Sequence, residues 1–173
     1  MKPKTVGRVG GQNPQAGRYQ SYASLDTGLL RGAILLTLDG EIPVEFLSVG
    51  DKIITRDSGI AKVEHIQRST RAVRTISFAA GSLGDTRPEH DALLAGDQMC
   101  LIRDWRAQGI FHVDRALVAA RTLVDGEFIT DLGYIEQTVF QLFCDGPHII
   151  YADGLELGTA DAMHARGDVL NAA

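Results

Sequence analysis

The stretch between residues 37 and 59 constrains the fold of this chain more than any other part of the sequence. It contains two runs with the composition of short strands, divided by the turn-forming pairs Asp39-Gly40 and Gly50-Asp51. Because glycine adopts the positive φ angles that tight turns require, such pairs are typical of hairpins. A third turn, Asp57–Gly59, ends the stretch. The segment therefore predicts compact β structure.

The rest of the chain continues this alternation of short apolar runs and turn residues. Turns recur at intervals of about eight to twelve residues, a spacing that is typical of all-β folds. We expect strands at Ala33–Leu36, Met99–Ile102, Phe128–Ile129, Tyr134–Phe143 and His148–Ala152, with two or three more between Ile60 and Phe78.

Two stretches have helical rather than strand-like spacing. Apolar residues three and four positions apart predict one short amphipathic helix over Val113–Leu123, which the pair Asp125-Gly126 ends. Val44–Leu47 fits a single helical turn. The predicted fold class is therefore all-β with one short helix.

Size and composition fit a single globular domain. The chain has 173 residues, of which 45% are hydrophobic and 23% charged, with a net charge of −5. The acidic balance and the scattered basic residues argue against nucleic-acid binding. No apolar run reaches the roughly 20 residues of a membrane helix, and the N-terminus has no hydrophobic signal core. We therefore expect a soluble protein without a membrane partner, cytoplasmic by default.

Composition also divides the chain into three parts. Residues 1–27 are rich in Gly, Gln, Ser, Asn and Pro, and they predict a flexible lead because they bury too little apolar surface to offset their ordering entropy. Residues 28–157 form the predicted domain, and residues 158–173 a tail that is either a frayed helix or disordered. Cys100 and Cys144 lie in apolar runs, so we expect buried, inert thiols.

The opening segment resembles the start of bacterial Hedgehog/intein (Hint) domains. A second block, Arg87–Ile102, and a third, His148–Glu156, extend the similarity. The resemblance implies a horseshoe-shaped all-β fold of short antiparallel strands with one short helix. The positions that carry the first block are Thr37, Asp39, Gly40, Val44, Leu47, Gly50, Asp51, Thr55, Asp57 and Gly59.

Hint domains rearrange or cut their own backbone, and the resemblance implies where that chemistry would occur. A Cys or Ser at the first domain position attacks the preceding carbonyl, and a His in a Ser-Pro-x-His block contacts the scissile amide. The nucleophile position falls on Gly28, and the Ser and His positions fall on Ala95 and Gln98. Glycine has no attacking group, and an amide cannot titrate near neutrality as imidazole does. We therefore predict a degenerate domain without self-splicing or autoproteolysis, which serves as a scaffold or interaction module for an unidentified protein partner.

Two alternatives remain open at this stage. The first is an active autoprocessing domain with Thr27 as a shifted nucleophile and Gln98 as the donor that polarises the carbonyl. The second is a hydrolase or small-ligand binder in which Asp97 and Gln98 converge with Asp145 and His148 on the concave face.

The third block leaves its own register open. His148 matches a histidine that is common there, but Gln141 stands where another histidine is expected, and the turn between them is one residue longer.

The remaining histidines do not indicate a metal site. His65, His112 and His164 have no Cys, His or carboxylate at ligand spacing, and His90 fits a solvated loop. The glycines of residues 7–11 lack the strand and helix that flank a phosphate-binding loop. We predict no metal and no cofactor.

Overall fold

The computed structural model describes residues 26–160. The predictions for the N-terminal lead fall almost entirely outside these described residues. So do most of the C-terminal tail and His164.

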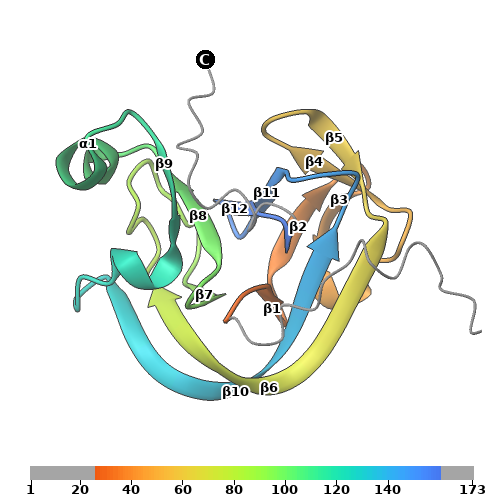
Figure 1. Ribbon diagram of the computed structural model, residues 1–173, viewed down its shortest axis with the longest axis horizontal. Coiled ribbons are helices and arrows are strands. Elements are labelled where there is room, and N and C mark those ends of the chain that lie inside the picture. The colour runs from red at the N-terminus through yellow and green to blue at the C-terminus, as the bar shows by residue number, and fades with distance from the viewer. Residues whose placement is uncertain (1–25, 161–173) are drawn as a thin grey trace, which may run out of the picture.

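Two long antiparallel strands form the curved base of the molecule. β6 (His65–Phe78) pairs with β10 (Ile129–Phe143) from the pair Phe78 and Ile129 to the pair His65 and Phe143. Figure 1 shows this ribbon bending into a U that carries the other strands on its two arms. β1 (Leu29–Leu30) adds to the outer edge of β10, and β7 (Ala92–Ala95) to that of β6.

A second sheet runs between the two arms. β11 pairs with β12 at its centre and with β2 and β4 on one side, while β12 pairs with β8 on the other. Its strands are, in spatial order, β3 (Gly40–Pro43), β2 (Ile34–Thr37), β4 (Lys52–Thr55), β11 (Ile149–Ala152), β12 (Leu155–Gly158), β8 (Met99–Ile102) and β9 (Ala116–Ala119), with β5 (Gly59–Lys62) paired to β4.

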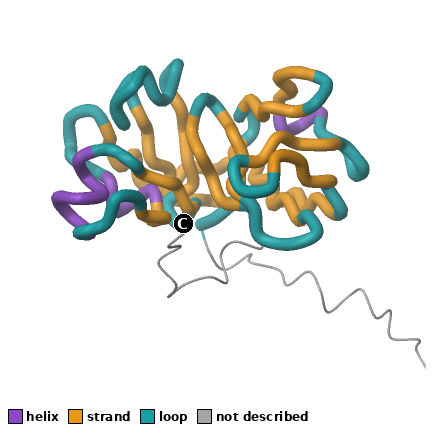
Figure 2. Tube along the Cα trace, turned by 90° about the horizontal axis from the view of Figure 1, so that it is seen from above, coloured by secondary structure: helices purple, strands orange, loops and turns teal. Residues whose placement is uncertain are grey.

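Helical segments are short and peripheral. They are η1 (Val44–Phe46), α1 (Trp105–Phe111) and η2 (Ala120–Leu123). Figure 2 shows them toward the two ends of the molecule. The predicted fold class is confirmed, because the described chain is built from antiparallel strands with one short α-helix.

The predicted hairpin and helical turn in the opening segment are confirmed. β2 and β3 pair around Leu38-Asp39, with Thr37 opposite Gly40, and the Thr37 side-chain hydroxyl donates to the Gly40 carbonyl over 2.7 Å. η1 follows β3 directly and buries Val44. This part of the fold therefore forms where its local turn chemistry predicts it.

The predicted helix over Val113–Leu123 is wrong. The helix lies earlier, at α1, where the Asp104 side chain accepts a hydrogen bond from the Arg106 backbone N–H at the helix start. Residues 116–119 instead form β9, paired with β8 so that Ala116 lies opposite Ile102. The short apolar run fits either structure, and the free edge of β8 provides the hydrogen bonds that decide for a strand.

The two strands predicted at Phe128–Ile129 and Tyr134–Phe143 are parts of one strand, β10, which has a bulge at Asp131-Leu132-Gly133 instead of ending there. The pairing register shifts between Asp131 and Tyr134, and Gly133 has a φ of 76°. The Asp131 side chain accepts a hydrogen bond from the Gly133 N–H over 2.8 Å. The turn-forming residues therefore bend a continuous strand.

The larger of the two apolar core clusters that the described residues form includes side chains from both arms of the U, and Cys100 and Cys144 are buried in it. The smaller cluster consists of Leu30, Val73, Ala95 and Val139. No helix among residues 26–160 is both long and apolar enough to cross a membrane.

Candidate functional site

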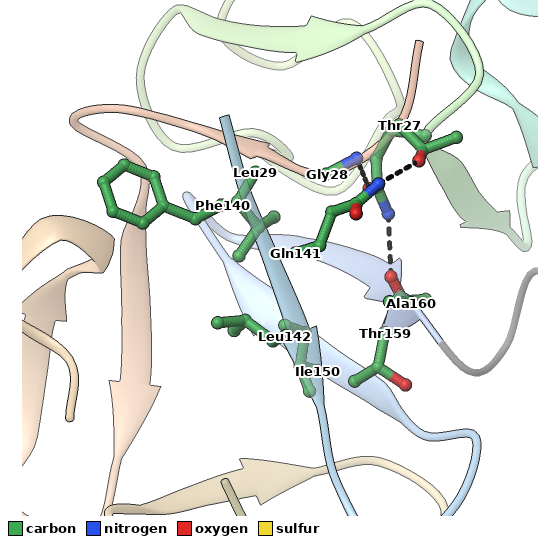
Figure 3. A pocket seen from close by; sticks show the side chains of 11 residues that line it. Thr27, Gly28, Leu29, Phe140, Gln141, Leu142, Ile150, Thr159 and Ala160 are labelled. Carbon is green, nitrogen blue, oxygen red and sulfur yellow. Dashed lines mark hydrogen bonds between the residues drawn. The ribbon is translucent and has the colours of Figure 1, made fainter. Parts of the chain in front are cut away.

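The segment Thr27-Gly28 enters the fold immediately before β1. Leu29 pairs with Phe140 and Leu30 with Val139, so Gly28 lies beside the next β10 residue, Gln141. Thr27 is 2% exposed. Gly28 has a φ of 110°, a conformation that side-chain-bearing residues rarely adopt. Figure 3 shows a small cavity lined by Thr27, Gly28 and Leu29 on one side and by Phe140 and Gln141 of β10 on the other.

Gln98 holds the backbone amide of Gly28. It lies in the turn between β7 and β8 and is 2% exposed. Its Oε1 accepts a hydrogen bond from the Gly28 N–H over 3.1 Å. Its Nε2 donates to two backbone carbonyls, those of Gly158 at 2.8 Å and Met99 at 3.1 Å. Because carbonyls only accept, these two bonds fix the orientation of the amide.

The space around Gly28 is closed to a side chain. A Cβ atom built on Gly28 would lie 2.5 Å from Val139 Cγ1, 3.0 Å from the Phe140 carbonyl oxygen and 3.1 Å from Gln141 Cγ. Non-bonded carbon atoms prefer separations of about 3.5–4.0 Å, so the neighbouring strand would have to move. β10 thus occupies the volume that a nucleophilic side chain at this position would need.

Thr27 faces the same cavity. Its Oγ1 accepts a hydrogen bond from Gln141 Nε2 over 2.9 Å. The cavity has a volume of about 10 Å³, which is close to the least that one water molecule needs. None of its lining residues has an ionisable side chain; they are Thr27, Gly28, Leu29, Gln98, Phe140, Gln141, Leu142, Ile150, Gly158, Thr159 and Ala160.

Asp97 contacts the residue that precedes Thr27. Its backbone N–H donates to the Asp26 carbonyl oxygen over 2.6 Å, and its Oδ2 lies 3.3 Å from the Asp26 nitrogen. Arg121 Nη1 lies 3.1 Å from Asp97 Oδ1. The β7–β8 turn therefore contacts the peptide groups on both sides of Thr27.

Ala95, which we align by sequence with the family's serine, is fully buried in β7 opposite Thr75. Neither Cys100 nor Cys144 lines the cavity. Burial raises the pKa of the Cys100 thiol to about 12, so the thiol is protonated at neutral pH.

His148 belongs to a different contact network. Its Nδ1 lies 2.8 Å from Asp57 Oδ2 and 3.2 Å from Ser58 Oγ, and its Nε2 lies 2.7 Å from Asp145 Oδ1. The other Asp57 oxygen accepts a hydrogen bond from the Ile149 N–H over 2.9 Å. These contacts tie the start of β11 to the β4–β5 hairpin. Burial acts to lower the pKa of His148, but the hydrogen bonds to both carboxylates outweigh it and raise that pKa.

The four residues of the predicted hydrolase site therefore do not converge. Asp97 and Gln98 lie beside the segment Asp26–Gly28, whereas Asp145 and His148 bond to each other and line no part of the cavity. The sequence did not indicate that Val139 fills the space beside Gly28. The alternating pattern of a strand does not show which residue of another strand will lie opposite a given side chain.

Among residues 26–160, no three His, Cys, Asp or Glu side chains gather as metal ligands.

Gln141 lies against Thr27, whereas His148 lies between the end of β10 at Phe143 and the start of β11 at Ile149. The register of the third block against the family pattern stays a prediction.

An all-β horseshoe with an N-terminal segment held against the β7–β8 turn defines an intein-like class of protein. The sequence profile of the Hint domain matches residues 27–162, so the chain belongs to the Hint domain family.

Solved structures agree with this fold at low sequence identity. A bacterial intein-like domain from Clostridium thermocellum has a TM-score of 0.52 and 14% identity, over 77% of this chain and 98% of its own. A DnaB intein from Synechocystis sp. PCC 6803 has a TM-score of 0.50 and 16% identity, over 77% and 99%. At these identities the likeness concerns the fold alone. No curated protein matches the sequence.

Proposed function

We propose that this chain is a Hint domain that does not cleave or splice itself and instead serves as a scaffold or interaction module. The observation that carries this proposal is the closed volume at Gly28, where a Cβ would lie 2.5 Å from Val139 Cγ1. An attacking atom has to approach the carbonyl to about 3–3.5 Å before a bond can form. Position 28 has neither the atom nor the room for it.

The orientation of Gln98 supports the same conclusion. Cleavage of an amide bond requires a proton for the departing nitrogen, which a general acid delivers. Gln98 presents its carbonyl oxygen to the Gly28 N–H, so it accepts from that nitrogen. Its amide hydrogens are committed to Gly158 and Met99. A group with this orientation stabilises the intact peptide bond.

A second candidate function is autoprocessing through Thr27. It is favoured by the 2.6 Å hydrogen bond from the Asp97 N–H to the Asp26 carbonyl, which is the carbonyl that Thr27 would attack. Against it, Thr27 Oγ1 accepts from the Gln141 amide, which cannot take up a proton. Nor does any ionisable side chain line the cavity to serve as the base.

Intact-mass measurement separates the two candidates. A reporter protein is fused ahead of the full chain, and the fusion is incubated with dithiothreitol or hydroxylamine, which intercepts an ester or thioester. A single unchanged mass supports the non-processing domain. Release of a fragment that ends at Asp26 or Thr27 contradicts it.

Two threonine variants identify the nucleophile if cleavage occurs. Thr27→Val removes the candidate hydroxyl, whereas Thr159→Val removes another buried hydroxyl from the same cavity lining. Cleavage lost only in Thr27→Val would establish autoprocessing through Thr27.

A further inference from the structure

A second, larger cleft lies on the arm of the molecule that carries α1, away from the Thr27-Gly28 site. Its volume is about 570 Å³, which is in the range of ligand-binding clefts. Three segments line it: the loop after β6, the start of α1 and the turn before β10. In Figure 1 α1 and the turn before β10 lie on the same arm as β7, β8 and β9. The lining consists of Ala80, Gly81, Ser82, Gly84, Asp104, Trp105, Arg106, Asp125, Glu127 and Phe128.

The charge of the cleft is predominantly negative. Three carboxylates line it, from Asp104, Asp125 and Glu127, against the single guanidinium of Arg106. Arg106 is engaged within the cleft, because it bonds Asp104, lies 3.8 Å from Asp125 and stacks 5.0 Å from the centre of the Trp105 ring. The lining therefore has more negative charge from its carboxylates than Arg106 can neutralise.

Asp125 is held in its ionised form. Its Oδ1 accepts backbone hydrogen bonds from Glu127, Phe128 and Ile129, each at 2.9 Å. Burial acts to raise the pKa of Asp125, but these hydrogen bonds outweigh it and lower that pKa. The negative charge of Asp125 is thus present throughout the neutral range.

Two aromatic rings accompany this charge. Trp105 is 70% exposed and Phe128 54% exposed. Exposed aromatic faces attract cations through their quadrupole; arginine is the more frequent partner, and tryptophan is the best ring. The Ser82 hydroxyl, in the same lining, is buried and makes no hydrogen bond within residues 26–160. Buried polar groups in native proteins are nearly always bonded.

We propose that this cleft binds a cationic peptide segment whose arginine or lysine side chains stack on Trp105 and Phe128 and pair with Glu127. A phosphate-bearing ligand is disfavoured by the three carboxylates. A neutral saccharide would use the aromatic rings but gain nothing from the excess charge. The inference rests on the proposed function, because it names the kind of partner that a non-processing Hint domain would hold.

The single tryptophan of the chain, Trp105, makes the test direct. The full chain is titrated with a short peptide of alternating arginine and glycine, and Trp105 fluorescence is recorded at low and at high salt. We expect a saturable fluorescence change that weakens as salt rises. The same change with the matching glutamate peptide, or with a neutral oligosaccharide and not the arginine peptide, would overturn the proposal.

Variants locate the binding by anisotropy of a labelled arginine peptide. Trp105→Ala and Glu127→Gln are expected to weaken binding by about fivefold each, the usual size for a partly exposed cation–π or ionic contact. Phe46→Ala and Glu41→Gln, both exposed and outside the cleft lining, are the matched controls. Equal affinity in all four variants overturns the assignment. The intact-mass measurement is separate, so self-cleavage and loss of peptide binding are distinguished.

Discussion

The backbone N–H of Gly28 donates a hydrogen bond to Oε1 of Gln98 over 3.1 Å, across 70 positions of sequence. The contact joins the segment before β1 to the turn between β7 and β8. In the alignment that we predict from the sequence, Gly28 and Gln98 correspond to the nucleophile and the histidine of the Hint pattern. The structure brings these two residues into contact.

Gly28→Ala is expected to destabilise the fold by more than Gly32→Ala does. Both glycines have positive φ angles, 110° and 93°, but only Gly28 has neighbours where the Cβ would lie. Strain at positive φ costs about 1 kcal/mol, and overpacking adds about 1–3 kcal/mol at Gly28 alone. Urea denaturation measures both variants. Equal losses of unfolding free energy would show that the space at Gly28 is not closed.

Gln98→Leu is expected to lower the free energy of unfolding by several kcal/mol. The variant leaves the Gly28 N–H and the carbonyls of Met99 and Gly158 without their partner. Each buried group left unpaired costs about 1–3 kcal/mol. The control is Gln108→Leu, an exposed glutamine on α1. A Gln98→Leu protein as stable as the control would contradict this role.

His148 is expected to stabilise the protein more at low pH than at high pH. Its pKa is raised in the folded state, so its stabilising contribution is fully present below the unfolded value of about 6.5 and is lost as pH rises through the folded value. The difference in unfolding free energy between wild type and His148→Gln should therefore shrink from pH 5.5 to pH 8.5. His90→Gln, at an exposed position, is the control. If the difference in unfolding free energy instead grew with pH, the contacts with Asp57 and Asp145 would not raise the pKa of His148.

Glu156→Gln is expected to be strongly destabilising. The Glu156 carboxylate is nearly inaccessible and pairs with Arg56 at 2.9 Å, Arg87 at 3.3 Å and Arg103 at 2.9 Å. Removal of one partner from a buried ionic network costs about 3 kcal/mol or more. Thermal unfolding compared with Glu41→Gln, which neutralises an exposed carboxylate, measures the effect. Equal melting temperatures for the two variants would show that the ion pairs of Glu156 with the three arginines do not stabilise the fold.

Local turn chemistry and block spacing made much of the fold predictable. Asp39-Gly40 and the run from Val44 form the hairpin and helical turn that their residue types indicate. The error over Val113–Leu123 arose where an apolar run fits a helix or a strand equally well, and only the edge of β8 decides. Trp105 and Phe128 line one cleft from separate segments, and no spacing in the sequence brings them together.

The sequence by itself determined that this chain folds as a β horseshoe, and it predicts that Gly28 and Gln98 stand where the family has its reactive groups. These are properties of residue identity and of local backbone preference. Only the tertiary structure decided that Val139 of β10 occupies the space beside Gly28, because two strands distant in sequence meet there. The space beside Gly28 is closed only because the Val139 side chain packs there, and the sequence of either strand does not show which side chain will be its neighbour.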